Sequence, residues 1–353
     1  MRAKALHPGG KFGHDSPMRK VSIKDLAART GLSQATVSLS LRNHPRISDD
    51  TKSRVLKAAK ELGYVYNRQA ANLRMSRTRT IGVCLNTIEN PVIARIFTGL
   101  LHFFQSQEWM VVFGDSEDQP QKQAAFLSAA LENNMAGLIV VPAVGTRLED
   151  LQAIARFVPL VVALRELRQS TLDQVRIDYE GGVHAAIDHL AALGHRKIGF
   201  IGAGLATETS RIGLAAYRAR MRHHGLDAPP ALTQACPTSR QAGFHAMTAL
   251  IEKGADMTAV LCFSDLIASG AMRAMAEAGL VAGRDISVVG FDDLDEASYL
   301  QPPLTTVRID QPFLGEAAGR LLLNRISDAG MPRQVVTIPS QLVLRATSRT
   351  LEA

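Results

Sequence analysis

Residues 21 to 74 read VSIKDLAARTGLSQATVSLSLRNHPRISDDTKSRVLKAAKELGYVYNRQAANLR, and this stretch decides the fold of the N-terminal part of the chain. Serines are spaced to cap three successive short helices, at Ser22, Ser33 and Ser48. Asp25 stands where a capping box needs it, and Gly31 ends the first helix and permits a tight turn. The pattern predicts a helix-turn-helix, whose second helix enters a DNA major groove.

The apolar residues of these helices recur at three- and four-residue spacing, which predicts one small shared core. The residues expected in that core are Ile23, Leu26 and Ala27, then Val37 and Leu41, then Val55, Leu56, Ala59 and Leu62.

The basic charge of the chain is concentrated in this module. Residues 18–79 hold 14 Lys and Arg but 4 Asp and Glu, a net of +10, whereas the 274 residues from 80 onward carry a net of −5. A basic module on an acidic body is typical of a phosphate-binding headpiece attached to a part that does not touch DNA.

The rest of the chain alternates short Val- and Ile-rich runs with helix-compatible stretches. The runs are TIGVCLN, WMVVFGD, GLIVVPA, LVVAL, KIGFIGA, AVLCFS and ISVVGFDD. Such runs predict buried parallel strands in α/β units, in one sheet or in two. The first 17 residues lack the apolar core of a signal peptide and are expected to be a disordered extension.

Several motifs make the chain similar to the lactose/galactose repressor (LacI/GalR) family of bacterial transcription regulators. They are D25-L-A-x-x-x-G31-L-S-x-x-T36-V-S, G63-Y-x-x-N67, A70-x-x-L73, G194-H-R-K-I-G-F and D285-I-S-V-V-G-F-D-D-L. The resemblance implies an all-α helix-turn-helix headpiece (18–65), a hinge helix and linker (66–79), and an α/β periplasmic-binding-protein-like body (80–350). That body would have two Rossmann-like lobes with parallel sheets joined by three crossovers, lobe 1 at about 80–177 and 309–337 and lobe 2 at about 178–308 and 338–350.

The resemblance also implies roles for residues of the headpiece. Base edges would be read by Gln34, Ala35 and Leu39, of which only Gln34 can pair bidentately, with adenine. Phosphates would be held by Ser22, Ser33, Thr36, Ser38, Arg42, Arg46 and Ser48. The serines at 22, 33 and 48 would serve as helix caps at the same time, and the alternative for the two arginines is a solvated surface charge.

The hinge segment NRQAANLR is too short and too polar to form a stable helix alone in water. By resemblance it would fold when two copies meet in the minor groove, with Leu73 as the kinking wedge and Ala70 on the same face. The alternative for Leu73 is packing inside a linker. The expected DNA-binding set is completed by Tyr64, Asn67 and Arg74.

Ligands of parallel α/β sheets bind at the carboxyl ends of the strands, and polar residues follow several of the expected strands. The effector-binding residues predicted in this way are Asn90, Pro91, Asp115, Arg165, Arg211, Ser264 and Asp292. Carboxylates and guanidinium groups facing one cleft suit a polyhydroxylated ligand. Asp265 is expected to be a structural cap and Asp293 to cap or to form an ion pair.

Two departures from the family pattern concern this cleft. Gly213 stands where the family usually has an effector-binding Arg, and Arg211 lies two residues earlier. Ser264 stands where Asn is common. Either Arg211 takes over the role or the effector lacks the group that the Arg normally holds.

Other candidate sites are weak. His184, His189 and His195 have no third ligand at zinc-like spacing, and Thr207 replaces the last glycine of a G-x-G-x-x-G dinucleotide motif. Trp109 is expected in the core. The cysteines, Cys84, Cys236 and Cys262, are expected to be free thiols, buried in the strand runs at Cys84 and Cys262. We therefore expect neither a cofactor nor a metal.

The sequence predicts a cytoplasmic, non-enzymatic, ligand-responsive DNA-binding protein, most simply a repressor. Its expected partners are near-palindromic double-stranded operator DNA, a sugar or similar small polar effector, and a second copy of the chain, with no membrane. A solute-binding protein would need an export signal, and an NAD-dependent enzyme would rest on the incomplete glycine motif.

Overall fold

The computed structural model describes residues 21–64, 78–167, 169–202 and 207–351. The chain divides into two compact units, residues 1–76 and 77–353, and each has its own core. The expected hinge residues Asn67, Ala70, Leu73 and Arg74 lie outside the described residues, so their roles stay predictions.

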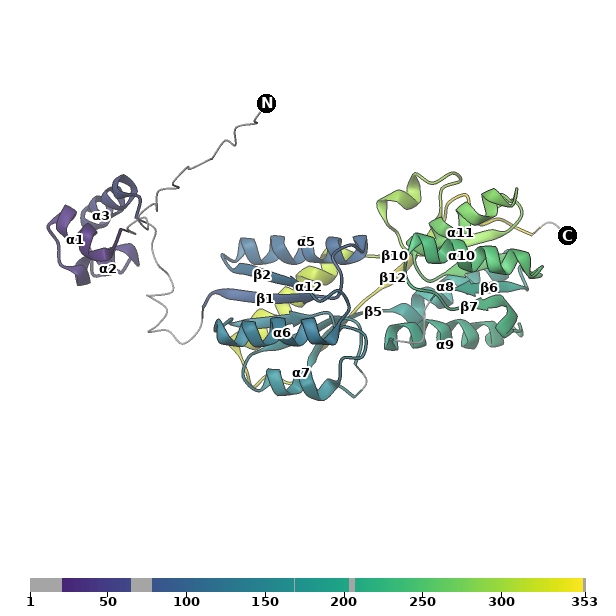
Figure 1. Cartoon of the computed structure of the whole chain (residues 1–353), viewed down its shortest axis with the longest axis horizontal. Helices are drawn as coiled ribbons and strands as arrows, with labels where there is room; N and C mark the ends of the chain where they lie inside the picture. The colour runs from purple at the N-terminus through teal and green to yellow at the C-terminus, as the bar shows by residue number, and fades with distance from the viewer. Residues whose placement is uncertain (1–20, 65–77, 168, 203–206, 352–353) are drawn as a thin grey trace, which may run out of the picture. The chain divides into compact units, whose positions relative to one another are not determined.

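The N-terminal unit, which we call the headpiece, contains the three expected helices. They are α1 (Ile23–Thr30), α2 (Gln34–Leu41) and α3 (Asp49–Leu62), shown in purple in Figure 1. Ser22, Ser33 and Ser48 cap them as predicted, each accepting a hydrogen bond from a first-turn backbone N–H. Gly31 adopts a φ of 69°, a left-handed conformation that glycine reaches without steric cost and that turns the chain into α2.

The headpiece core differs from the predicted one at a single apolar residue. Leu26, Val37 and Val55 are fully buried and the other predicted residues pack around them, but Leu56 is 56% exposed. One residue along a helix turns the side chain by about 100°, so Leu56 leaves the face that Val55 occupies. Ala58 is buried on that face instead.

The second unit, the body, contains two six-stranded sheets. The sheet of lobe 1 has the order β11-β5-β4-β3-β1-β2, and all its pairings are parallel. Its strands are β1 (Thr80–Leu85), β2 (Met110–Asp115), β3 (Gly137–Val140), β4 (Leu160–Leu164), β5 (Asp173–Ile177) and β11 (Val335–Ile338). The helices beside it are α5 (Pro91–Ser106), α6 (Pro120–Glu132), α7 (Leu148–Ala155) and α12 (Gln311–Ser327).

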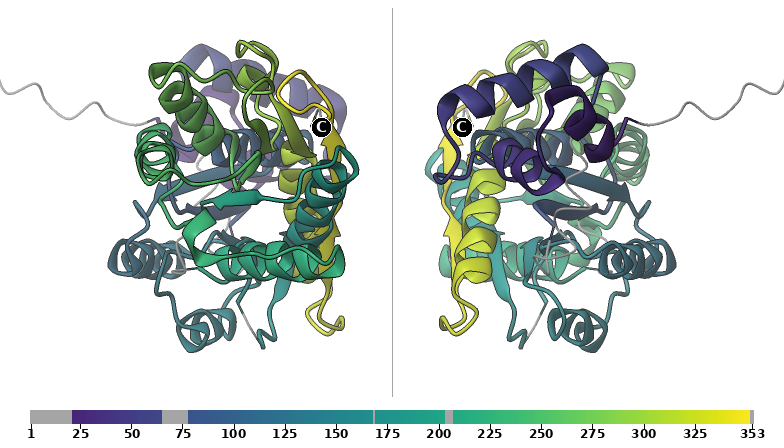
Figure 2. Two further views of the ribbon diagram at one scale, coloured as in Figure 1. Left: turned by 90° about the vertical axis from the view of Figure 1, so that its right-hand side faces the viewer. Right: turned by 90° about the vertical axis from the view of Figure 1, so that its left-hand side faces the viewer.

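The sheet of lobe 2 has the order β12-β10-β9-β8-β6-β7 and is parallel except for the pairing of β10 with β12. Its strands are β6 (Ile198–Ile201), β7 (Thr233–Gln234), β8 (Ala259–Cys262), β9 (Ser287–Asp292), β10 (Thr305–Ile309) and β12 (Ser340–Val343). The elements beside it are α8 (Tyr179–Ala192), α9 (Glu208–His223), α10 (Arg240–Glu252), α11 (Asp265–Glu277) and the short 3-10 helices η1 (Pro230–Leu232) and η2 (Asp295–Ser298). Helices lie on both faces of each sheet (Figures 1 and 2).

The chain passes between the lobes three times, from β5 to α8, from β10 to α12 and from β11 to β12. The predicted class, an all-α headpiece with a two-lobed α/β body, is therefore confirmed. All seven apolar runs contain strands, but β2 is not buried. It is one of the two edge strands of its sheet, and Met110 is 59% and Phe113 49% exposed.

The described residues contain no helix that combines the length and the hydropathy needed to span a membrane. Within the same residues, no three His, Cys, Asp or Glu side chains gather in a way suited to a metal ion. Cys84, Cys236 and Cys262 are buried free thiols, and burial raises the pKa of Cys84 to about 12 and that of Cys236 to about 11. Trp109 packs against the core of the body.

Candidate nucleic-acid interface and ligand cleft

The second helix of the headpiece presents an outer surface of mixed polar and apolar side chains. Gln34 and Ala35 in its first turn are exposed, and Leu39, one turn later, is half-buried. These three residues were expected to read bases, and their side chains are not needed for the headpiece core, which uses Val37 of the same helix. A helix that keeps its first-turn side chains free can place them against base edges.

The predicted phosphate-binding residues surround this surface. Ser33 and Thr36 share a hydrogen bond of 2.9 Å, and Arg42 donates to the Ser38 hydroxyl at 2.8 Å. Arg46 is exposed. Tyr64 follows α3 and packs at the edge of the headpiece core. Ser22 and Ser48 cap α1 and α3, which leaves both hydroxyls at helix N-termini, where backbone N–H groups also favour phosphate.

Within residues 21–64, most basic side chains form no ion pair with an acidic side chain of the same range. Within residues 21–64, the ion pairs of basic side chains are Arg29 with Glu61 and Lys52 with Asp49. The remaining basic side chains of this range are Lys24, Arg42, Arg46, Arg54, Lys57 and Lys60. Such a surplus attracts a polyanion before any base is read.

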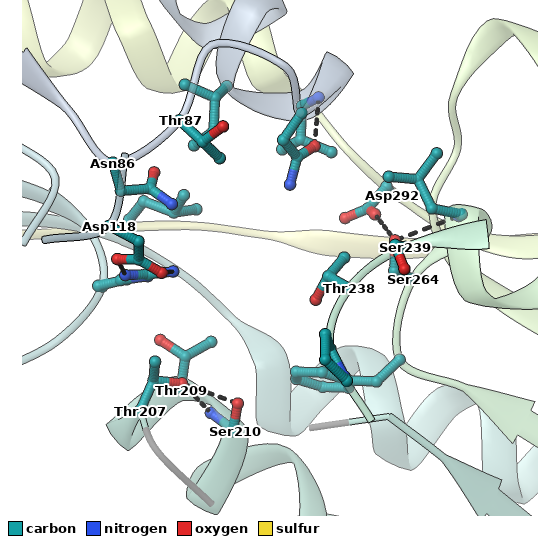
Figure 3. A pocket seen from close by; sticks show the side chains of 18 of the residues that line it. Asn86, Thr87, Asp118, Thr207, Thr209, Ser210, Thr238, Ser239, Ser264 and Asp292 are labelled. Atoms are coloured by element: carbon teal, nitrogen blue, oxygen red, sulfur yellow. Dashed lines mark hydrogen bonds and ion pairs between the residues drawn. The ribbon is translucent and has the colours of Figure 1, made fainter. Parts of the chain in front are cut away.

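The body contains a cavity of about 680 Å³ between the carboxyl ends of the two sheets, which we call the ligand cleft. Residues of both lobes line it, and Figure 3 shows their side chains converging from opposite walls. Four predicted effector residues line it: Asn90, Arg165, Ser264 and Asp292.

The other three predicted effector residues lie elsewhere. Pro91 is the first residue of α5 and is not among the residues that line the cleft. Asp115 at the end of β2 accepts hydrogen bonds from the backbone N–H groups of Ile88 and Glu117, so its carboxylate shapes the adjoining loops. Arg211 lines a neighbouring cavity of about 250 Å³ and pairs with Glu208 at 2.7 Å.

Asp292 ends β9 on the lobe 2 side of the cleft. It is 7% exposed, and its Oδ2 accepts a hydrogen bond of 2.9 Å from the hydroxyl of Ser264, the N-cap of α11. Its φ of 115° is unusual for any residue with a Cβ. Strained backbone of this kind persists where the surrounding structure holds it and gathers at functional sites.

Burial raises the pKa of the Asp292 carboxyl well above its usual range, and the nearby Asp265 carboxylate raises it further. Asp265 itself is buried, and its pKa is raised to about 7, chiefly by burial. It accepts hydrogen bonds from Thr306 Oγ1 at 2.5 Å and from Leu294 N at 2.8 Å, so its role is structural, but the cap that was expected of it is supplied by Ser264, the N-cap of α11. Asp293 forms ion pairs with Arg308 and Arg345.

Sequence reasoning missed several residues of the cleft wall. Asp118, in the loop after β2, holds the Arg165 guanidinium, and Asn86 directly follows β1. The rule that ligands meet the carboxyl ends of strands would have found Asn86 had it been applied one residue after the strand. Thr209 and Tyr179 lie at the starts of helices, and Phe263 directly follows a strand. Sequence patterns do not show which way these side chains point.

The close packing around Gly213 on α9 accounts for the absence of the arginine that the family usually has at this residue. A Cβ there would collide with the ring of Phe263, which lines the cleft. Any side chain at residue 213 therefore requires Phe263 to move.

His189 and His195 have ordinary protein partners, whereas the buried Nε2 of His184 has no hydrogen-bond partner among the described residues. His195 uses both ring nitrogens, with Thr258 Oγ1 at 2.9 Å and the Arg349 carbonyl at 3.1 Å, and His189 contacts Ser348 at 2.9 Å. The glycine motif after β6 lies partly outside the described residues.

Both parts of the chain match known families. Residues 22–67 match the model of bacterial regulatory proteins of the lacI family, and residues 187–348 match that of the periplasmic binding protein-like domain. The chain is 28% identical over 333 residues to the HTH-type transcriptional repressor CytR of Escherichia coli (strain K12), with 94% of this chain and 97% of that protein covered.

Solved structures agree over the same range. A lac repressor dimer bound to operator and the anti-inducer ONPF superposes with a TM-score of 0.86 at 27% identity, covering 94% of this chain and all of that one. A LacI family regulator from Enterococcus faecium with bound ribose has a TM-score of 0.68 at 25% identity, covering 77% of this chain and 100% of that one. Because headpiece and body both match, and in the same order, the chain belongs to the LacI/GalR family of bacterial transcription regulators.

Proposed function

We propose that this ligand-responsive DNA-binding regulator represses transcription by binding operator DNA with two headpieces. A small polar effector in the ligand cleft changes the affinity of the regulator for the operator. The observation that carries the proposal is the presence, in one chain, of a basic helix-turn-helix and a polar cleft formed by two lobes. A ligand that bridges two lobes joined by three chain segments can bias their relative orientation, and a DNA-binding unit attached to lobe 1 is then affected.

The proposal assigns base reading to Gln34, Ala35 and Leu39, and effector contact to Asn90, Ser264 and Asp292. It includes no chemical step, since the proposed action is binding alone. A regulator of this kind acts where the chromosome lies, so we place it in the bacterial cytoplasm, associated with the nucleoid.

The proposed assembly is a homodimer. An edge strand normally carries charged or shielding residues, because exposed apolar edges pair with other chains. On β2, however, Met110, Val112 and Phe113 are all exposed. The lac repressor that superposes on this chain is a dimer on its operator. A second copy of the chain covering β2 would remove this apolar surface from water.

The DNA-binding part of the proposal is tested by band shift with the full chain and with residues 77–353. The full chain should bind DNA with an affinity that falls steeply with salt, and residues 77–353 should not bind. A truncated body that retains the DNA affinity would refute the headpiece assignment.

The dimer is tested by sedimentation of Met110→Asp, with Phe157→Asp as the matched control. Phe157 is 74% exposed beside α7 and lies outside the β2 edge, so its variant should sediment like the wild type. Met110→Asp should sediment as a monomer, because a charge at the centre of an apolar interface is costly to bury. Equal behaviour of the two variants would place the interface elsewhere.

A further inference from the structure

Asp292 has an unusual backbone conformation, and the residue that follows it shares this feature. The φ angles of Asp292 and Asp293 are 115° and 54°, values that residues with a Cβ rarely adopt. Two such residues in succession persist only where their surroundings hold them. Within lobe 2, Ser264 donates to the Asp292 carboxyl at 2.9 Å, a bond that Figure 3 shows at the cleft wall. Asp293 forms its ion pairs with Arg308 and Arg345.

A further contact to this backbone comes from lobe 1. Gln311 donates from Nε2 to the carbonyl oxygen of Asp292 at 2.5 Å. Gln311 is 2% exposed, so water does not compete for this bond. It is the first residue of α12, which packs against β3, β4 and β5 of the lobe 1 sheet. Asp292 is therefore held from both lobes, by its carboxyl from Ser264 of α11 and by its carbonyl from Gln311 of α12.

Gln311 lies where the chain passes from lobe 2 to lobe 1. β10 ends at Ile309 and Asp310 caps α12, so the Gln311 amide reaches back to lobe 2 only two residues after the chain has left it. A rotation of α12 relative to β9 must change the backbone torsions at this passage. A hydrogen bond weakens with angle as well as with distance, so such a rotation would weaken the bond between Gln311 and Asp292 even near the pivot.

The start of α12 is fixed within lobe 1. Gly99 of α5 lies against the backbone of Pro312, and Gly315 of α12 lies against the backbone of Ile96, with no room for a Cβ at either glycine. Helices in such close backbone contact cannot shift relative to one another without a clash. Gln311, which precedes Pro312, therefore moves together with α5, and α5 begins at the lobe 1 wall of the ligand cleft.

We propose that Gln311 is a positioning residue that ties the conformation of Asp292 in the ligand cleft to the arrangement of the two lobes. The inference rests on the proposed function, because it takes Asp292 as an effector contact. An effector that binds the Asp292 carboxyl acts on a residue whose carbonyl is bound from lobe 1. A change in the Asp292 backbone then alters the bond to Gln311 and favours a different arrangement of lobe 1, to which the headpiece is joined.

The arrangement of the lobes can be measured without DNA or effector, by pulsed electron paramagnetic resonance of the full chain. Spin labels are attached through Glu132→Cys on α6 of lobe 1 and Glu252→Cys on α10 of lobe 2, both at exposed residues. The native thiols are buried, and burial raises the pKa of each, so they react slowly with the label. An excess of unlabelled chain ensures that each distance is measured within one chain.

Gln311→Met removes the donor and keeps the length of the buried side chain. The ratio between lobe arrangements in the distance distribution should shift by about two-fold to ten-fold, which corresponds to the net contribution of one hydrogen bond. Gln174→Met is the matched control, because Gln174 is 3% exposed and its amide donates to the Leu167 carbonyl at 3.4 Å, within lobe 1. The control should give the wild-type distribution. A folded Gln311→Met chain that also gives the wild-type distribution overturns the inference.

Gln311→Glu separates the hydrogen bond from the shape of the side chain. Burial keeps a carboxyl group protonated, so at about pH 5 its O–H can donate to the Asp292 carbonyl in place of the amide. This variant should give the wild-type distribution at that pH. An equal change in Gln311→Met and Gln311→Glu would assign the effect to packing and overturn the inference.

If Gln311→Met does not fold, Gln311→Asn takes its place, since its amide falls one methylene group short of the Asp292 carbonyl. The same shift is expected, and its absence overturns the inference in the same way. Failure of the proposed function itself would appear separately, in the band shift of the full chain against residues 77–353.

Discussion

Arg95 on α5 donates from Nη1 to Oδ1 of Asp295 in η2 at 2.7 Å, and this ion pair joins lobe 1 to lobe 2. The Asp295 side chain is 79% exposed, so water screens the attraction. Exposed pairs contribute about 0–1 kcal/mol. This ion pair can therefore shift the equilibrium between arrangements of the two lobes slightly, but it cannot hold the body in one arrangement.

Replacing Arg95 by Gln should change the affinity of the cleft for its effector by less than about five-fold, because the lost interaction is below about 1 kcal/mol. Titration calorimetry of Arg95→Gln beside Arg147→Gln, whose pair with Asp150 lies within lobe 1, measures this. A change of more than a hundred-fold in Arg95→Gln alone would show that this pair locks the lobes.

Asp292→Asn should separate ligand binding from stability. The variant keeps an oxygen that can accept from Ser264 but cannot become the charged acceptor that donors of a bound effector would stabilise, so effector affinity should fall by about ten-fold to a hundred-fold. Because burial already disfavours the charged carboxylate, the unliganded variant should melt at neutral pH no lower than the wild type. A lower Tm with unchanged effector affinity would make Asp292 a purely structural residue.

The stability of the body should fall as the pH rises from about 4 to about 7, relative to Asp265→Asn. The pKa of Asp265 is raised from 3.8 to about 7 in the folded chain. Over that interval the unfolded chain has released the proton and the folded chain still holds it, so a rising pH favours unfolding. Thermal melts of residues 77–353 across this range test the sign, and a wild-type curve parallel to that of Asp265→Asn would contradict the raised pKa.

Gly213→Ala should destabilise the body by about 1–3 kcal/mol, because the new methyl group collides with the Phe263 ring. Phe263→Leu in the same chain should restore part of the loss by making room. Denaturant unfolding of the two single variants and the double variant measures the coupling. Additive effects of the two substitutions would mean that the Phe263 ring is not the reason for glycine at residue 213.

Gln34→Ala should relax the preference of the headpiece at one base pair, at a cost of about 1–3 kcal/mol for the preferred base. Gln34 is exposed in the first turn of α2, so its loss should not unfold the headpiece. Binding to operators that carry single-base substitutions measures the effect. A uniform loss of affinity across all operators would instead indicate that Gln34 contacts the phosphate backbone.

The sequence was sufficient to predict the headpiece because its signals are local. Capping serines, Gly31 and helical spacing act within a few residues, and only Leu56 was placed on the wrong face. Seven strands, the edge strand β2 among them, were equally readable from their apolar runs. Other strands were not readable in this way, since β7 has two residues and β5, which starts at a buried Asp173, has no continuous apolar run.

The cleft was predicted only in part, because its geometry depends on contacts between distant residues. Asp292 and Ser264 were found as polar residues after strands, and the structure adds the bond between them. Nothing in the sequence around Arg165 indicates that Asp118, 47 residues earlier, holds its guanidinium. The close approach of Gly213 to the Phe263 ring likewise brings together two segments that are distant in the sequence, and no local pattern predicts it.

In the proposed mechanism, an effector in the ligand cleft controls the affinity of the headpiece for DNA. The most direct test is a fluorescence anisotropy titration of the full chain onto an operator selected from genomic fragments, with and without a neutral sugar that calorimetry shows to bind. The sugar should change operator affinity in the wild type, and this change should be lost at the same sugar concentration in Asp292→Asn. A sugar that binds in the cleft and leaves operator affinity unchanged would contradict the proposed mechanism.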